Sequence, residues 1–126
     1  MKGKLQREID LPIATVSESN THEHWTKSRK RHREQQFIMR SAMKGVDITL
    51  PCIIEFTRCS SRTLDSDNLP VSCKWLRDEI ADILIPGLKK GRADDDPRLE
   101  WTYEQLKSRK KRTIVRFYEM HKTIPT

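Results

Sequence analysis

The chain has little of what marks a secreted or membrane protein. Among its 126 residues are only three cysteines, Cys52, Cys59 and Cys73. An odd number without a CxxC pair argues against a disulfide framework or a zinc site and predicts reduced, partly buried thiols. No apolar run approaches the ~20 residues of a membrane span, and the first residues lack the apolar stretch of a signal peptide. We therefore expect a soluble, intracellular, single domain over 1–126.

Charge is plentiful but unevenly distributed. The net charge is +7 and the pI is about 9.5, which favours a polyanionic partner. Residues 1–64 carry a net +5, residues 65–100 a net −3, and residues 101–126 a net +5. Carboxylates repel phosphates, so an acidic centre on a phosphate-binding surface needs an intervening cation such as Mg²⁺. The alternative is that these acids only solvate a helix and a loop.

Hydrophobic periodicity predicts four strands and two helices. The strands are expected over 6–15, 47–59, 98–105 and 113–120, and the helices over 22–44 and 69–84. Pro51 favours an edge position or a bulge near the start of the second strand. The order β-α-β-α-β-β indicates an α+β domain with a mixed sheet covered by two helices.

Two groups of carboxylates stand out in the acidic centre. Asp65 and Asp67 flank Ser66 in an extended segment, where alternate side chains face the same way, so the pair could hold one divalent cation. The alternative for Asp67 is helix capping. Asp94, Asp95 and Asp96 form a second group, for which the alternative is a solvated loop flanked by basic residues. If the two groups met at one edge of the sheet, they would form a three-carboxylate metal site.

Lys74 lies four residues before Asp78 on the second predicted helix. That spacing suits an ordinary helical ion pair. Its alternative role is a cation that stabilises phosphate charge in a transition state.

Basic residues gather in two dense clusters and one pair, which we predict to contact DNA phosphates with little sequence preference. The alternative is that they only provide solubility. These predicted DNA-binding residues are Lys27, Arg29, Lys30, Arg31 and Arg33 in the first helix, Arg58 and Arg62 before the Asp65 segment, and Lys107, Arg109, Lys110, Lys111 and Arg112 in the last turn.

Together these motifs resemble the RusA family of Holliday junction resolvases, in its phage or prophage branch. The resemblance rests on Asp65-x-Asp67-Asn68, Lys74-x-x-x-Asp78 and Asp95-Asp96-x-x-Leu99, in this order over roughly the last two-thirds of the chain. One departure is that Lys74 follows Asp67 by seven residues, where the best-known members place the lysine four residues on. The resemblance implies a RusA-like fold and a homodimeric, metal-dependent endodeoxyribonuclease. Such an enzyme nicks two opposing strands of a four-way junction in DNA recombination and repair.

The resemblance also implies roles for individual residues. Asp65, Asp67 and Asp96 would hold Mg²⁺ or Mn²⁺, with Asp95 as the substitute for Asp96 if the register is off by one. The catalytic set would be Asp65, Asp67, Lys74 and Asp96, with metal-activated water attacking the phosphodiester. The implied partners are branched DNA and a second copy of the chain, without a membrane, in the cytoplasm of a bacterial or phage-infected cell. Two alternatives remain open, a nuclease for flaps or replication intermediates and a non-catalytic nucleic-acid-binding protein.

Overall fold

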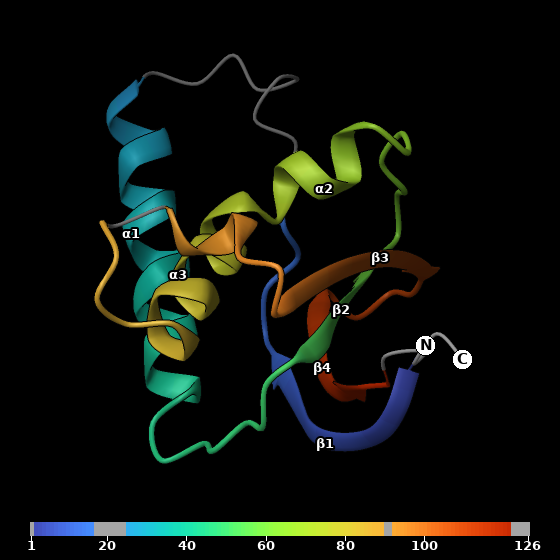
Figure 1. Ribbon diagram of the computed structural model, residues 1–126. Coiled ribbons are helices and arrows are strands. Elements are labelled where there is room, and N and C mark those ends of the chain that lie inside the picture. The colour runs from blue at the N-terminus through green and yellow to red at the C-terminus, as the bar shows by residue number, and fades with distance from the viewer. Residues whose placement is uncertain (1, 17–24, 90–91, 122–126) are drawn as a thin grey trace.

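The computed structural model describes residues 2–16, 25–89 and 92–121, which form one four-stranded sheet and a layer of helices (Figure 1). None of the described helices is long and apolar enough to cross a membrane. The elements in chain order are β1 (Lys2–Leu11), α1 (Trp25–Ala42), β2 (Cys52–Ser60), α2 (Asn68–Ser72), α3 (Lys74–Leu84), the short 3₁₀ helix η2 (Ala93–Asp95), β3 (Leu99–Lys107) and β4 (Arg112–Met120).

The sheet is mixed, as the sequence predicts. Its strand order is β1-β4-β2-β3, with β2 parallel to β3 and β4 antiparallel to both β1 and β2. The α+β class and the mixed sheet are therefore confirmed. The helices lie on one face of the sheet, and α2 with α3 takes the place of the single second helix in the predicted order (Figure 1).

β2 is a central strand, which corrects the edge position expected from Pro51. Every residue of β2 is buried, and the strand is hydrogen-bonded to β3 on one side and β4 on the other. The strand begins after Pro51, so the missing N–H of the proline removes no bond from the ladder. The Pro51 carbonyl instead accepts a hydrogen bond from the Met120 N–H at 3.2 Å.

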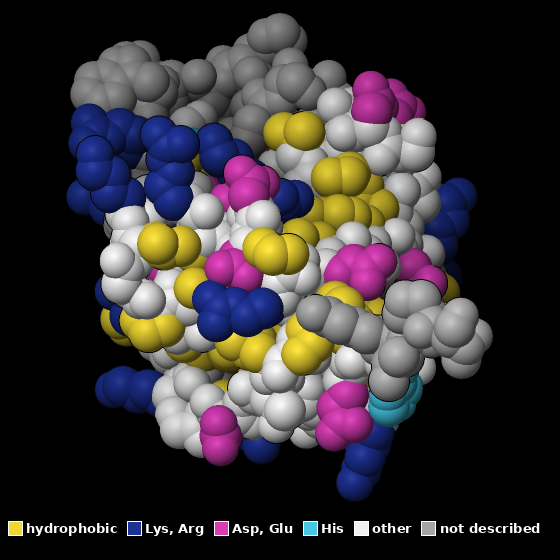
Figure 2. All heavy atoms as spheres, viewed as in Figure 1, with side chains coloured by type: hydrophobic (Ala, Val, Ile, Leu, Met, Phe, Trp, Pro, Cys, Tyr) yellow, Lys and Arg dark blue, Asp and Glu magenta, His cyan; other side chains and the backbone are white. Residues whose placement is uncertain are grey.

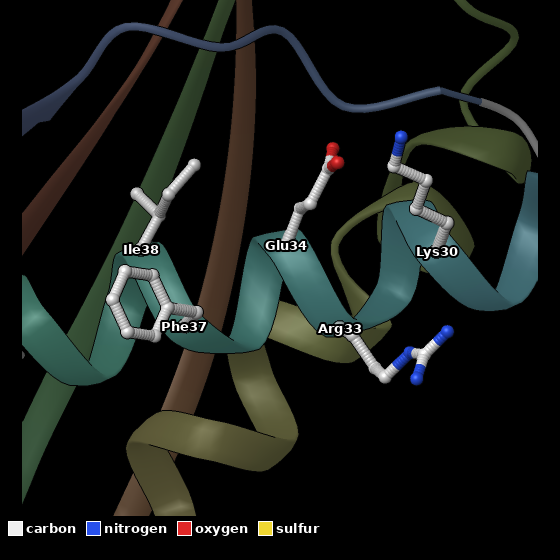
Figure 3. A pocket seen from close by; sticks show the side chains of 5 residues that line it. All are labelled: Lys30, Arg33, Glu34, Phe37 and Ile38. Atoms are coloured by element: carbon white, nitrogen blue, oxygen red, sulfur yellow. The ribbon is translucent and has the colours of Figure 1, made fainter.

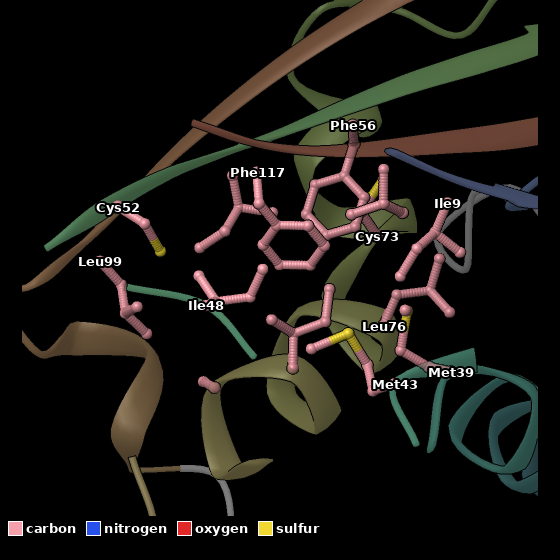
Figure 4. Close-up of a cluster of buried hydrophobic side chains, with 14 of the residues drawn as sticks. Ile9, Met39, Met43, Ile48, Cys52, Phe56, Cys73, Leu76, Leu99 and Phe117 are labelled. Atoms are coloured by element: carbon pink, nitrogen blue, oxygen red, sulfur yellow. The ribbon is translucent and has the colours of Figure 1, made fainter. Parts of the chain in front are cut away.

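The hydrophobic core fills the space between the sheet and the pair α1 and α3 (Figure 4). Phe56 and Phe117 reach it from the two central strands, Met39 from α1, and Leu76 and Ile80 from α3, all fully buried. The Leu76–Ile80 spacing of four residues is what places both on one helix face. The core thus fixes α3, and with it the loop before α2, against the sheet.

The predicted helix over 69–84 is interrupted at Cys73, which separates α2 from α3. Pro70 has no N–H to donate, and its carbonyl accepts from the Cys73 N–H in a tighter i+3 turn at 3.1 Å. The Ser72 hydroxyl donates to the Leu69 carbonyl at 2.7 Å and lies 2.8 Å from Thr15 Oγ1. These short-range hydrogen bonds interrupt the regular α-helical pattern between α2 and α3.

Replacing Leu76 by alanine should lower the free energy of unfolding by about 2–5 kcal/mol, because Leu76 is fully buried and its loss leaves a cavity. Urea denaturation measures the change. The control is Leu88→Ala, because Leu88 is 54% exposed and its truncation should change stability by less than about 0.5 kcal/mol. Equal effects of the two variants would contradict the described core.

Candidate functional site

Asp65 and Asp67 lie on the loop between β2 and α2, and both are exposed. Neither carboxylate makes a hydrogen bond or ion pair with any residue in the described part of the chain. The turn into α2 is made by the backbone, where the Asp65 carbonyl accepts from the N–H groups of Asn68 and Leu69 at 3.0 and 3.1 Å. Asp67 stands at the N-cap position without a side-chain cap bond. The capping alternative for Asp67 is therefore not supported, and both carboxylates remain available.

Gln105 on β3 anchors the loop immediately before Asp65. Its side-chain N–H donates to the Leu64 carbonyl, and its side-chain oxygen accepts from the Leu64 N–H, both at 2.7 Å. The amide thus pairs with Leu64 as a neighbouring strand would. This contact fixes the loop to the end of the sheet and determines where Asp65 emerges.

Arg58 also holds this loop, which differs from its predicted contact with DNA. Its side chain is buried, with Nε donating to the Thr15 carbonyl at 2.7 Å and Nη1 donating to the Arg62 carbonyl at 2.8 Å. Burial lowers the pKa of its guanidinium. A phosphate could reach this group only if these contacts broke, so Arg58 fits a positioning role. Arg62 is exposed, as a DNA contact requires.

The basic turn between β3 and β4 lies at the same end of the sheet as the aspartate loop. Ser60 is in register with Lys107, and the Ser108 N–H donates to the Ser60 carbonyl at 3.0 Å. Arg112 is half-buried and pairs with Asp10 at 3.3 Å. The exposed cations of this turn are Lys107, Arg109, Lys110 and Lys111.

The second basic cluster covers the N-terminal half of α1, where Lys and Arg gather on one surface (Figure 2). Lys30 and Arg33 border a pocket of about 370 Å³ together with Glu34, Phe37 and Ile38 (Figure 3). Phe37 is 66% exposed there. The other members of this cluster are Lys27 and Arg29, which are exposed, and Arg31, which is half-buried.

The three consecutive aspartates before β3 have three different environments. Asp96 is bound by Arg98, whose Nε and Nη2 donate to the two carboxylate oxygens at 3.0 Å each. Those side-chain bonds, with the Arg98 backbone N–H, lower the pKa of Asp96 to about 2. Asp95 is exposed. Asp94 pairs with Arg77 at 3.1 Å.

The structure does not bring Asp96 to the Asp65 loop. Leu64 is tied to Gln105, six residues along β3 from Leu99, which corresponds to about 20 Å of strand. Asp96 precedes Leu99 at the opposite end of β3. In the described part of the chain, no three His, Cys, Asp or Glu residues are placed to hold a metal ion together. The assignment of Asp65, Asp67, Asp95 and Asp96 as ligands stays a prediction. Ser66 and Asp67 form a turn instead of the expected extended segment, and the backbone of Asp67 is helical (φ −78°, ψ −27°). Strand alternation therefore does not place the Asp65 and Asp67 carboxylates on one side.

Lys74 opens α3 and is exposed, with its Nζ 5.0 Å from the centre of the Trp75 ring. Its ammonium forms no ion pair with a described carboxylate. Asp78, one turn later, is half-buried, and this burial raises its pKa. The charge of Asp94 raises that pKa further, while Lys74 and Arg77 oppose the rise. The helical ion pair expected between Lys74 and Asp78 is therefore not formed, and Lys74 acts on Asp78 only through its charge.

Arg77 is the functional candidate that the sequence did not single out. Its Nη2 pairs with Asp94 at 3.1 Å, its Nη1 donates to the Tyr103 hydroxyl at 2.9 Å, and its guanidinium lies 5.2 Å from the centre of the Trp101 ring. The only available signal was the alternation of Trp101 and Tyr103, which places both on the helix-facing side of β3. Nothing in the spacing shows that an α3 arginine meets them.

Comparison of the chain with protein-family models and with curated proteins finds no match. The function is therefore inferred from the residues of this chain. Those residues provide two exposed carboxylates, Asp65 and Asp67, that no described residue binds, a basic turn attached to the same end of the sheet, and a charged group around Arg77.

Replacing Gln105 by alanine should release the loop before Asp65, because the Leu64 N–H and carbonyl lose both partners. Each such bond contributes on the order of 1 kcal/mol, so hydrogen exchange at the Leu64 amide should accelerate about 5- to 30-fold. Amide exchange followed by NMR measures this. Glu104→Ala changes the exposed neighbour on β3 and should leave the Leu64 rate unchanged.

Replacing Arg98 by alanine should raise the pKa of Asp96 from about 2 toward the ordinary value of 3.8, because the two side-chain hydrogen bonds to the carboxylate disappear. In the native chain, this contact stabilises the fold above pH ~4, and the contribution is lost as the pH falls toward 2. A carboxyl ¹³C NMR titration reports the pKa. The exposed Arg92 provides the control, since Arg92→Ala should leave the Asp96 titration in place.

Proposed function

We propose that the chain is a metal-dependent, structure-selective DNA endonuclease of the RusA type, which resolves four-way junctions by paired nicks. Two opposing strands must be cut, so two copies of the site are needed, and a homodimer provides them. The reaction is hydrolysis of a phosphodiester bond in each of the two strands.

One observation carries this proposal: no described residue binds the Asp65 or Asp67 carboxylate, although their loop and the β3–β4 turn with its exposed cations are attached to the same end of β2. The chain has 25 Lys and Arg against 18 Asp and Glu, so cations are abundant. Yet no described side chain pairs with either carboxylate. The Gln105 bonds to Leu64 and the Ser108 bond to Ser60 attach loop and turn to the same strand end. Carboxylates can hold a metal that activates water, and cations can bind the phosphate backbone, so both parts of a metal-dependent nuclease are available at this end of the sheet.

Asp65 and Asp67 fit a divalent cation by their chemistry, because both present exposed, unpaired carboxylate oxygens. Mg²⁺ commonly takes one or two protein carboxylates and keeps several waters. Asp96 does not fit as it stands, since Arg98 binds both of its oxygens. When bound, the metal would lower the pKa of a water and so supply the nucleophile.

The remaining residues of the proposed site bind and position DNA. Lys107, Arg109 and the two lysines that follow would bind backbone phosphates beside the aspartate loop, and the α1 cluster would bind a second stretch of backbone. Gln105 and Arg58 are positioning residues, because their hydrogen bonds fix the loop. Unlike the exposed cations, both are buried or half-buried. Lys74 would act by its charge rather than by donating a proton.

Replacing Asp67 by asparagine should reduce Mg²⁺-dependent nicking of a labelled four-way junction by at least about 100-fold, because one anionic ligand is lost while the side-chain shape is kept. Gel electrophoresis of cleaved strands measures nicking, and fluorescence anisotropy measures junction binding, which should be retained. The matched control is Asp47→Asn, an exposed aspartate before β2.

Undiminished cutting by the Asp67→Asn protein with DNA binding intact would contradict the nuclease assignment. Binding of every DNA form without nicking, even by the unsubstituted protein, would support the non-catalytic alternative. Linear duplex, flap and four-way DNA should be compared side by side, since preferential cutting of flaps would support a replication-intermediate nuclease instead.

A further inference from the structure

A second pocket lies at the junction of α2 and α3. It has a volume of about 270 Å³ and is lined by Pro70, Val71, Lys74, Arg77 and Asp94. Ligand pockets commonly measure about 300–1,000 Å³, so this one suits a small group or one unit of a polymer. Its lining combines an apolar wall, two cations and one carboxylate.

Asp94 is held rigidly at the pocket by contacts at both ends of the residue. Its Oδ2 pairs with Arg77 at 3.1 Å, and its backbone carbonyl accepts a hydrogen bond from Trp101 Nε1 at 3.0 Å. Arg77 is itself fixed by the Tyr103 hydroxyl at 2.9 Å. Oδ1 has no hydrogen-bond partner among the described residues, and a carboxylate can accept about four bonds. Asp94 therefore presents a positioned acceptor, which lowers the entropic cost of binding.

The opposite side of the pocket offers a cation and an apolar surface. Lys74 forms no ion pair with a described carboxylate, so its ammonium is free to bind an anion. Val71 is 48% exposed although it is hydrophobic, and Pro70 is half-buried beside it. A flat apolar group could cover Val71 and remove that surface from water.

We infer that this pocket binds one unpaired nucleotide of the DNA, with its base against Pro70 and Val71, its pairing edge on Asp94 and its phosphate on Lys74. The inference rests on the proposed function, because that function supplies DNA as the ligand. It adds the recognition of one base by Asp94, Pro70 and Val71 to the cleavage assigned to Asp65 and Asp67, and Lys74 is shared between the two. Arg77 is its positioning residue.

The chemistry of the pocket also selects among bases. A carboxylate only accepts hydrogen bonds, so it binds the base edge that presents the most N–H groups. Guanine presents two adjacent N–H donors on its pairing edge, and thymine presents one. That edge is accessible only when the base is unpaired, as at a branch point or a strand end. The pocket should therefore prefer an unpaired guanine to an unpaired thymine.

Titration of the ¹⁵N-labelled full chain with deoxyguanosine monophosphate tests the inference without requiring cleavage. The amide signals of Val71, Lys74 and Asp94 should shift, with thymidine monophosphate binding about tenfold more weakly. Asp94→Asn should weaken guanine-nucleotide binding about tenfold, whereas Asp95→Asn changes an exposed neighbour and should not. Lys74→Gln should weaken the binding of deoxyguanosine monophosphate but not that of deoxyguanosine, which lacks the phosphate.

Asp94→Asn also weakens the ion pair with Arg77, which holds η2 to α3. A second variant therefore leaves that ion pair intact. Val71→Asp places a charge on the apolar wall and should abolish nucleotide binding, while Leu88→Asp alters a similarly exposed residue and should not. Shifts confined to other surfaces, or unaltered binding by Asp94→Asn and Val71→Asp, would overturn the inference. Junction cleavage without nucleotide binding would defeat this inference alone, and nucleotide binding without cleavage would defeat the proposed nuclease alone.

Discussion

The complete burial of β2 is the constraint on which the rest of the structure depends. A strand buried on both faces must satisfy its backbone groups inside the sheet, and β2 does so by pairing with β3 in parallel and β4 in antiparallel orientation. The parallel pairing fixes which loops share an end of the sheet. The aspartate loop and the basic turn meet at the end of β2 near Ser60, whereas Asp96 is placed at the end near Cys52. The directions of the strands therefore determine which charged loops share an end of the sheet.

Local features of the fold could be predicted from the sequence, because periodicity is a local property. The apolar spacing of Leu76 and Ile80 placed both on one face of the predicted helix, and both are buried. The break at Cys73 was missed because the apolar periodicity continues through it, whereas the break is made by hydrogen bonds from Cys73 to Pro70 and from Ser72 to Leu69. The central position of β2 was missed because Pro51 was assigned to the strand, when it stands just before it.

The candidate site was predictable only in part, and for a similar reason. Asp65 and Asp67 are exposed because they lie in a turn that is made by hydrogen bonds to residues three and four positions away. A polar turn of this kind can be recognised in the sequence. Arg58 has the same side chain as a DNA-binding arginine, but it is bound by the backbone carbonyl of Arg62, four residues on, and by that of Thr15, 43 residues away. For Asp96 the sequence did contain a signal, since Arg98 lies two residues away, close enough to bind both carboxylate oxygens. Arg77 had no such signal, because its partners Tyr103 and Trp101 are on a strand 24 or more residues away.

In so basic a chain, whether a cation binds a given carboxylate indicates the role of that carboxylate. The buried Glu55 is bound by Arg116 and Lys2, because an unpaired charge at that depth would be strongly destabilising. Exposed pairs contribute only about 0–1 kcal/mol, so Asp65 and Asp67 can remain unpaired at little cost to the fold. The cost arises when a phosphate backbone approaches the neighbouring turn, because both carboxylates then repel it. A divalent cation between the carboxylate and phosphate oxygens would cancel both repulsions, and the proposed function needs a metal at this loop for that reason.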